Sequence, residues 1–89
     1  MLVSLLMKLI FSDHARCQMV ERGASEAEVV EAVTHGERTP AKQGRIAHRR
    51  NFDYNRLWSG KQYRIKQVMP ITKNESNHTI VITVYTFYF

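Results

Sequence analysis

The chain has 89 residues and a mass of 10.4 kDa, which is enough for one small domain with a compact core. Thirteen Lys and Arg against eight Asp and Glu give a net charge of +5 and a pI near 9.7. A single cysteine and the lack of paired Cys/His spacing exclude a disulfide-stapled secreted fold and a structural zinc finger. We therefore expect one domain over residues 1–89 that uses no metal and no cofactor.

The first eleven residues are apolar except for Ser4 and Lys8. This stretch is too short to cross a bilayer as a helix, which needs about 20 residues, and it lacks the basic start and the cleavage site of a signal peptide. Residues 7–12 instead predict a short first strand. We interpret residues 1–6 as an upstream extension with Met7 as the natural start, and we expect a cytoplasmic protein with no membrane partner.

Two helices are predicted next. A helix begins at Ser12 or Asp13 and runs to Arg22, where a glycine follows. The sequence Ser-Glu-Ala-Glu from Ser25 is a capping box. In this motif the serine hydroxyl accepts a hydrogen bond from the backbone N–H of the second glutamate, and the side chain of that glutamate accepts one from the backbone N–H of the serine. It predicts a second helix over residues 25–35, again ended by a glycine.

After residue 36 the spacing of apolar residues changes from a period of 3.6 residues, typical of helices, to a period of two residues, typical of strands. A loop is expected at 39–44, a turn at Ser59-Gly60 and a polar turn at 73–77. The predicted strands cover residues 45–52, 54–58, 62–71 and 79–89.

The last strand is rich in β-branched and aromatic residues and has no Gly or Pro. Strict alternation places Ile82 and Val84 on one face, and Val81 and Tyr85 on the other. Apolar residues on both faces indicate an interior strand. The order of elements predicts an α+β fold in which two N-terminal helices pack on one face of a twisted antiparallel sheet.

Positive charge is concentrated in residues 38–73, which hold ten Lys or Arg and one Asp, whereas residues 1–37 are net acidic. Tyr54, Trp58 and Tyr63 lie among these cations, so bases can stack where the phosphate backbone is neutralised. This interleaving favours a nucleic-acid-binding surface over a merely solvated face. The predicted nucleic-acid-binding residues are Arg45, His48, Arg49, Arg50, Lys61, Arg64 and Lys66.

The remaining reactive side chains are those that metal-independent ribonucleases use: a base for the ribose 2′-OH, cations for the phosphate oxygens and an acid for the leaving oxygen. His14 and Arg22 lie along one polar row of the first predicted helix. Strand alternation places Arg64 and Lys66 on one face, away from the core. The candidate catalytic residues are His14, Arg22 and Tyr85, with His48 as a further candidate.

Each catalytic candidate also has a structural interpretation. His14 can make a helix-entry hydrogen bond, Arg22 can pair with an acid, and Tyr85 can belong to the core. Residue types alone leave both interpretations open.

The chain resembles a bacterial family of small, uncharacterised domains at two motifs. One is F-S-x-H-A-x-x-x-M-x-x-R-G-x-S at residues 11–25, and the other is V-I-T-V-Y at residues 81–85. That family is similar to RelE/ParE-type toxins and to the barnase–RelE-like nuclease fold. The resemblance implies two helices on an antiparallel sheet and suggests RNA cleavage or toxin action, with His14, Arg22 and Tyr85 at the motif positions. The family's usual arginine four residues after the histidine is Gln18 here.

Three functions follow from these observations. The first is a metal-independent RNase or toxin-like domain that acts on RNA at the ribosome and is restrained by a small acidic antitoxin. The second is a non-catalytic module that binds nucleic acid or protein through the same basic sheet. The third is a toxin relative that inhibits a protein target. The catalytic candidates favour the first function, and Gln18 favours the second.

Overall fold

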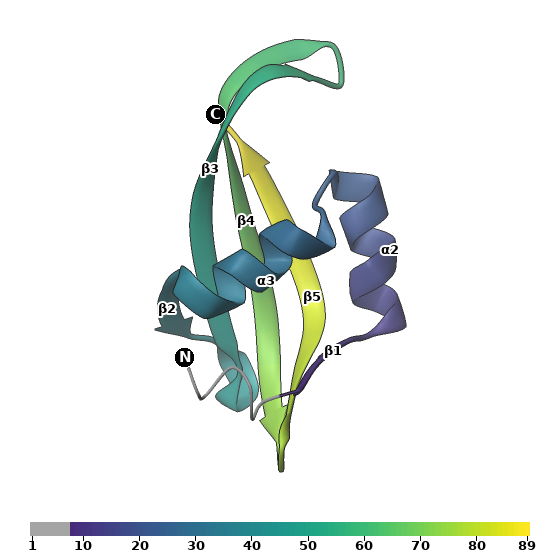
Figure 1. The fold of residues 1–89 in the computed structure, drawn as a ribbon, viewed down its shortest axis with the longest axis vertical. Coiled ribbons are helices and arrows are strands. Elements are labelled where there is room, and N and C mark those ends of the chain that lie inside the picture. The colour runs from purple at the N-terminus through teal and green to yellow at the C-terminus, as the bar shows by residue number, and fades with distance from the viewer. Residues whose placement is uncertain (1–7) are drawn as a thin grey trace.

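The computed structural model describes residues 8–89. The interpretation of residues 1–6 as an extension and of Met7 as the natural start falls outside the described residues. The strands form one sheet in the order β1-β5-β4-β3-β2 (Figure 1). The elements are β1 (Lys8–Phe11), α2 (Asp13–Arg22), α3 (Glu26–His35), β2 (Glu37–Pro40), a 3-10 turn (Lys42–Gly44), β3 (Ile46–Trp58), β4 (Lys61–Glu75) and β5 (His78–Tyr88).

Both helices cover the same face of the sheet (Figure 1). α2 packs along β5, and α3 crosses β3 and β4. This arrangement confirms the predicted α+β fold with two N-terminal helices on a sheet. The sheet is mixed rather than purely antiparallel, because β1 pairs with β5 in parallel while the other neighbours are antiparallel.

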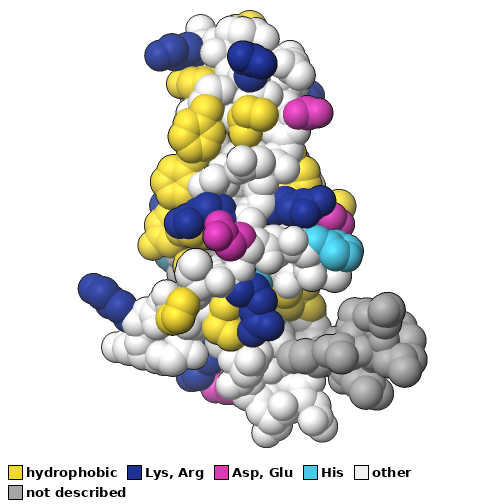
Figure 2. Space-filling view, turned by 90° about the vertical axis from the view of Figure 1, so that its left-hand side faces the viewer, with side chains coloured by type: hydrophobic (Ala, Val, Ile, Leu, Met, Phe, Trp, Pro, Cys, Tyr) yellow, Lys and Arg dark blue, Asp and Glu magenta, His cyan; other side chains and the backbone are white. Residues whose placement is uncertain are grey.

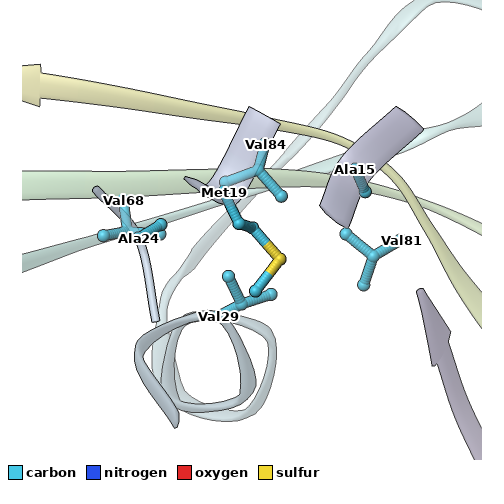
Figure 3. Close-up of a cluster of buried hydrophobic side chains, with 7 residues drawn as sticks. All are labelled: Ala15, Met19, Ala24, Val29, Val68, Val81 and Val84. Atoms are coloured by element: carbon cyan, nitrogen blue, oxygen red, sulfur yellow. The ribbon is translucent and has the colours of Figure 1, made fainter. Parts of the chain in front are cut away.

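The core lies between the helices and the covered face of β4 and β5 (Figure 3). Small and β-branched side chains let the helices approach the sheet closely, as close packing of an interior requires. The buried cluster consists of Ala15, Met19, Ala24, Val29, Val68, Val81 and Val84.

The helix ends confirm the predicted caps. Ser12 Oγ accepts a hydrogen bond from a backbone N–H of the first turn of α2, and Ser25 and Glu28 form the reciprocal capping box of α3. Gly23 ends α2 in the left-handed region with φ of 77°. A Cβ there would lie 2.7 Å from the Trp58 ring, so this position requires glycine for both conformation and space.

The predicted limits of three strands were wrong. Residues 45–52 and 54–58 belong to one strand, β3, because the break at Asp53 is a bulge in which Asn55 has φ of 51°. The predicted loop at 39–44 overlaps the last two residues of β2, a four-residue edge strand paired with β3 that was not predicted. β4 continues to Glu75 and shortens the predicted polar turn, because its polar end still pairs with β5.

The predicted faces of β5 were also wrong. Val81 pairs with Thr72 and Thr83 pairs with Ile71, so Ile82 is an extra residue in β5. This bulge interrupts the two-residue alternation. As a result Val81 and Val84, which alternation placed on opposite faces, are both fully buried in the cluster under the helices.

His48 lies inside the sheet, with 4% of its surface exposed. Its Nε2 is 2.8 Å from Thr72 Oγ1, and its Nδ1 has no hydrogen-bond partner within the described part of the chain. Burial, followed by the charge of Arg38, lowers the pKa of His48 below its ordinary value of 6.5. The ring is therefore neutral in the folded protein near neutral pH.

We expect acid to destabilise the fold through His48. The unfolded chain takes up a proton at this ring as the pH falls through 6.5, whereas the folded chain does so only at a lower pH, so the free energy of unfolding decreases with falling pH in this range. Urea unfolding at several values between about pH 7.5 and 5.5 measures the effect. His48→Gln should show a weaker pH dependence, and a dependence equal to that of the wild type would contradict the assignment.

Candidate functional site

The polar row of α2 faces the edge of β5. β1 pairs with β5 only as far as Val81, so in the described residues no strand accompanies that edge beyond this point. Gln18 Oε1 accepts the Val84 N–H at 2.8 Å, and Arg22 Nη1 donates to the Val84 carbonyl at 2.8 Å. Two side chains of the helix thus satisfy backbone groups that a neighbouring strand would otherwise pair.

The structure brings together two of the three predicted catalytic residues. The Arg22 guanidinium carbon lies 5.3 Å from the centre of the Tyr85 ring, and Tyr85 is 40% exposed. His14 is exposed in the first turn of α2, eight residues or about 12 Å of helix axis from Arg22. Within residues 8–89 it makes no hydrogen bond or ion pair that would tie it to the other two.

The C-terminal end of α2 is fixed to the sheet by side-chain donors. Thr86 Oγ1 donates to the Arg22 carbonyl at 2.9 Å, and the Tyr88 hydroxyl donates to the same oxygen at 2.6 Å. Burial raises the pKa of Tyr88, which keeps this hydroxyl protonated and able to donate. These two bonds satisfy the Arg22 carbonyl, one of the last carbonyls of the helix, which have no partner within the helix itself.

Lys66 belongs to this interior junction and not to the surface. Its side chain is 8% exposed, and its Nζ lies 2.8 Å from a Glu28 carboxylate oxygen and donates to the Gly23 carbonyl at 2.8 Å. The expectation that Lys66 points away from the core together with Arg64 was therefore wrong, because this face of β4 is covered by α3. Neither Lys66 nor the buried His48 can form part of an exposed nucleic-acid surface.

The other predicted binding residues, Arg45, Arg49, Arg50, Lys61 and Arg64, are partly or fully exposed. Two of them lie on the hairpin that joins β3 and β4. This arm, residues 54–64, extends past the helices (Figure 1), and cationic and hydrophobic side chains alternate over its surface (Figure 2).

Aromatic rings and cations are in contact on the arm. The Arg56 guanidinium lies 5.0 Å from the Tyr54 ring centre, and Lys61 Nζ lies 5.8 Å from that of Tyr63. Trp58, which directly precedes the turn of the arm and pairs with Lys61, stacks on Tyr88 with ring centres 4.9 Å apart. The arm thus combines positive charge with aromatic faces, the two features by which proteins hold single-stranded nucleic acid.

A polar hollow of about 310 Å³ lies where α3 ends and β2 begins. Arg50 is fixed beside it by Glu31 Oε2 at 3.2 Å and by the His35 carbonyl at 3.4 Å. The same carboxylate oxygen lies 3.3 Å from His35 Nδ1. The hollow is lined by His35, Glu37, Arg49, Arg50, Asn51 and Gln67.

Sequence reasoning missed most of the hollow. The i, i+4 spacing of Glu31 and His35 was a signal for their contact. Asn51 and Gln67 had no such signal, since they meet only through the register of β3 against β4.

No group of three His, Cys, Asp or Glu within residues 8–89 is arranged to hold a metal ion. The same residues include no helix of the length and apolarity that a membrane span needs.

A family model matches residues 11–86. The chain belongs to the DUF4258 family. The family is described as a domain of unknown function, in agreement with the resemblance to a family of uncharacterised domains. Searches of curated proteins and of solved structures found no match to this DUF4258 domain.

In this DUF4258 domain we expect Gln18 to stabilise the edge of β5. Gln18→Leu keeps the size of the side chain but leaves the buried Val84 N–H without an acceptor, which costs about 1 to 3 kcal/mol of unfolding free energy. Urea unfolding followed by circular dichroism measures the loss.

Two further variants serve as controls. Gln18→Glu retains an oxygen acceptor, so its free energy of unfolding should fall by less than that of Gln18→Leu. His14→Ala changes an exposed residue of the same helix, and its free energy of unfolding should stay within about 0.5 kcal/mol of the wild-type value. A Gln18→Leu protein as stable as the wild type would show that the edge does not depend on this bond.

Proposed function

We propose that this domain binds single-stranded RNA through the arm and the adjoining sheet face that the helices leave uncovered. The observation that carries the proposal is the alternation of exposed cations with half-buried aromatic rings along the arm. Cations neutralise phosphates, and an aromatic face adds about 1 to 3 kcal/mol for each base that stacks on it.

The distribution of ion pairs supports this proposal. Three cations of residues 38–73 are paired with carboxylates: Arg50, Lys66 and Lys73. The others have no carboxylate partner within residues 8–89, so their charge is available to a polyanion. These seven are Arg38, Lys42, Arg45, Arg49, Arg56, Lys61 and Arg64.

RNA is favoured over duplex DNA for two reasons. Aromatic side chains on a sheet surface suit unstacked bases, which single-stranded RNA presents and a duplex does not. In addition, the motifs at residues 11–25 and 81–85 resemble those of a family similar to RelE/ParE-type toxins, a resemblance that suggests RNA cleavage or toxin action.

We expect RNA binding to weaken steeply with salt. If about five cations contact phosphates, the logarithm of the association constant should fall with that of the salt concentration at a slope of about −3.5. Lys61→Ala/Arg64→Ala should reduce the steepness by about 1.4 if both side chains contact phosphate. Fluorescence anisotropy with a labelled single-stranded RNA at several salt concentrations measures both values.

The matched control removes the same net charge elsewhere. Arg16→Ala/Lys73→Ala deletes two cations that are paired with Glu26 and Glu75, and it should leave the slope nearly unchanged. A wild-type slope near zero would contradict RNA binding. Equal changes in the two double variants would mean that net charge, and not the arm, sets the affinity.

The second candidate function is RNA cleavage without metal, in the manner of a RelE-like toxin held in check by a small acidic protein. The contact between Arg22 and Tyr85 favours it, because it places a phosphate-binding group beside a phenol that can transfer a proton. The carbonyl of Val84 holds the guanidinium in this position.

Cleavage is tested by incubating the purified domain with RNA in excess EDTA. If the domain is a nuclease that uses the Arg22–Tyr85 contact, Tyr85→Phe should slow cleavage by about 10²- to 10⁴-fold while RNA affinity changes little, because it removes only a proton-transfer group. Binding without cleavage by the wild type would contradict this candidate and leave the binding function intact.

A further inference from the structure

The sheet face opposite the helices carries a row of three neighbouring side chains. Asn51 of β3 pairs in register with Gln67 of β4, and Gln67 pairs with Phe87 of β5. Paired residues on adjacent strands lie on the same face about 5 Å apart. Val68 and Lys66 on either side of Gln67 point toward the helices, so the row lies on the uncovered face.

The first two members of the row are held by each other. Gln67 Nε2 donates to Asn51 Oδ1 at 2.8 Å. This bond fixes both amide planes and leaves Gln67 Oε1 as an acceptor and Asn51 Nδ2 as a donor. A fixed acceptor beside a fixed donor matches the edge of an unpaired base, which offers the complementary pair of groups.

The third member supplies an aromatic surface. Phe87 is 40% exposed, and its ring centre lies 6.4 Å from that of Tyr85 in a stacked arrangement. An exposed aromatic ring next to fixed amides is what a protein needs to hold a base by its face and to recognise its edge.

Arg49 provides the charge for the phosphate. It precedes Asn51 by two residues on the same strand, so it lies on the same face about 7 Å away. The contact that fixes its guanidinium is with Met69 Sδ at 3.1 Å, a weak acceptor. The neighbouring Arg50 is paired with Glu31 on the helix side. Of these two arginines, Arg49 is therefore the one whose N–H donors can bind a phosphate.

We propose that Arg49, Asn51, Gln67 and Phe87 form a subsite for one nucleotide of single-stranded RNA. The base stacks on Phe87 and is recognised at its edge by the Asn51–Gln67 amide pair, and its phosphate is bound by Arg49. The arm supplies affinity for any sequence, and the subsite supplies the preference for one base. This assignment rests on the proposed RNA-binding function and adds to it the source of base selectivity.

The test compares labelled homopolymers of A, U and C at fixed salt. The wild type should prefer one homopolymer by about tenfold over the weakest. Gln67→Met keeps the side-chain length but removes both hydrogen-bonding groups, and it should reduce the preference to near unity while the slope of affinity against salt stays unchanged. Gln43→Met changes an exposed glutamine that lies outside both the arm and the subsite, and this variant should retain the preference.

Two further variants separate the roles within the subsite. Phe87→Leu should weaken all three homopolymers by about tenfold, because stacking does not depend on base identity. Arg49→Ala should reduce the steepness of the salt dependence by about 0.7, the effect of one phosphate contact. Circular dichroism and thermal unfolding of each variant establish that it is folded.

The outcomes distinguish this subsite from the proposed function. A wild type that binds no RNA overturns both. A wild type that binds RNA without preference, or a Gln67→Met protein that keeps the wild-type preference, overturns the subsite and leaves RNA binding in place.

Discussion

The end of α2 is the junction on which the rest of the structure depends. Its last carbonyls, those of Arg22 and Gly23, accept hydrogen bonds from Thr86, Tyr88 and Lys66, which come from two strands. A helix end buried against a sheet needs such donors, since an unpaired buried carbonyl costs about 1 to 3 kcal/mol. The bonds therefore fix the helix, the last strand and the root of the arm as one unit.

The same junction explains several features that look unrelated along the chain. Tyr88 stacks on Trp58, which directly precedes the turn of the arm, and a Cβ at Gly23 would collide with the Trp58 ring and with the Tyr88 hydroxyl. Lys66 extends the junction to α3 through Glu28. Aromatic residues of the arm are thereby held in place, and for the proposed function this lowers the entropic cost of binding.

The motif at residues 11–25 and the motif at residues 81–85 are in direct contact in the fold. Ser12 caps α2, and Gln18 and Arg22 bind the backbone of Val84. Ser12 and Arg22, which belong to the shared motifs, thus help to build the contact between α2 and β5. We infer that the motifs identify the fold, and that the arm and the uncovered sheet face provide the binding function.

The sequence was sufficient to predict those elements whose ends are set by local interactions. Each helix is bounded by a capping serine, Ser12 or Ser25, and by a glycine after its last turn. These residues act within one turn of the helix ends, so the bounds of both helices were predicted closely. The β5 bulge at Ile82 depends instead on the register with β4, and sequence spacing carries no information on it.

The burial of Lys66 was unpredictable for the same reason. A lysine between polar residues is typical of an exposed strand face, and only the position of Glu28 and of the Gly23 carbonyl makes an interior position favourable. The amide pair of Asn51 and Gln67 likewise exists only once β3 and β4 are aligned. Charge composition indicated a polyanion-binding segment but not which of its cations remain exposed.

The central claim is that RNA is bound by the arm and the neighbouring uncovered face. The most direct measurement is a titration of the ¹⁵N-labelled domain with a short single-stranded RNA, followed by amide chemical shifts. We predict saturable shifts concentrated in residues 54–64 and around Asn51, Gln67 and Phe87, with little change on the outer side of α2 near Arg16. A spectrum that does not change with RNA, or shifts confined to α2, would contradict the account.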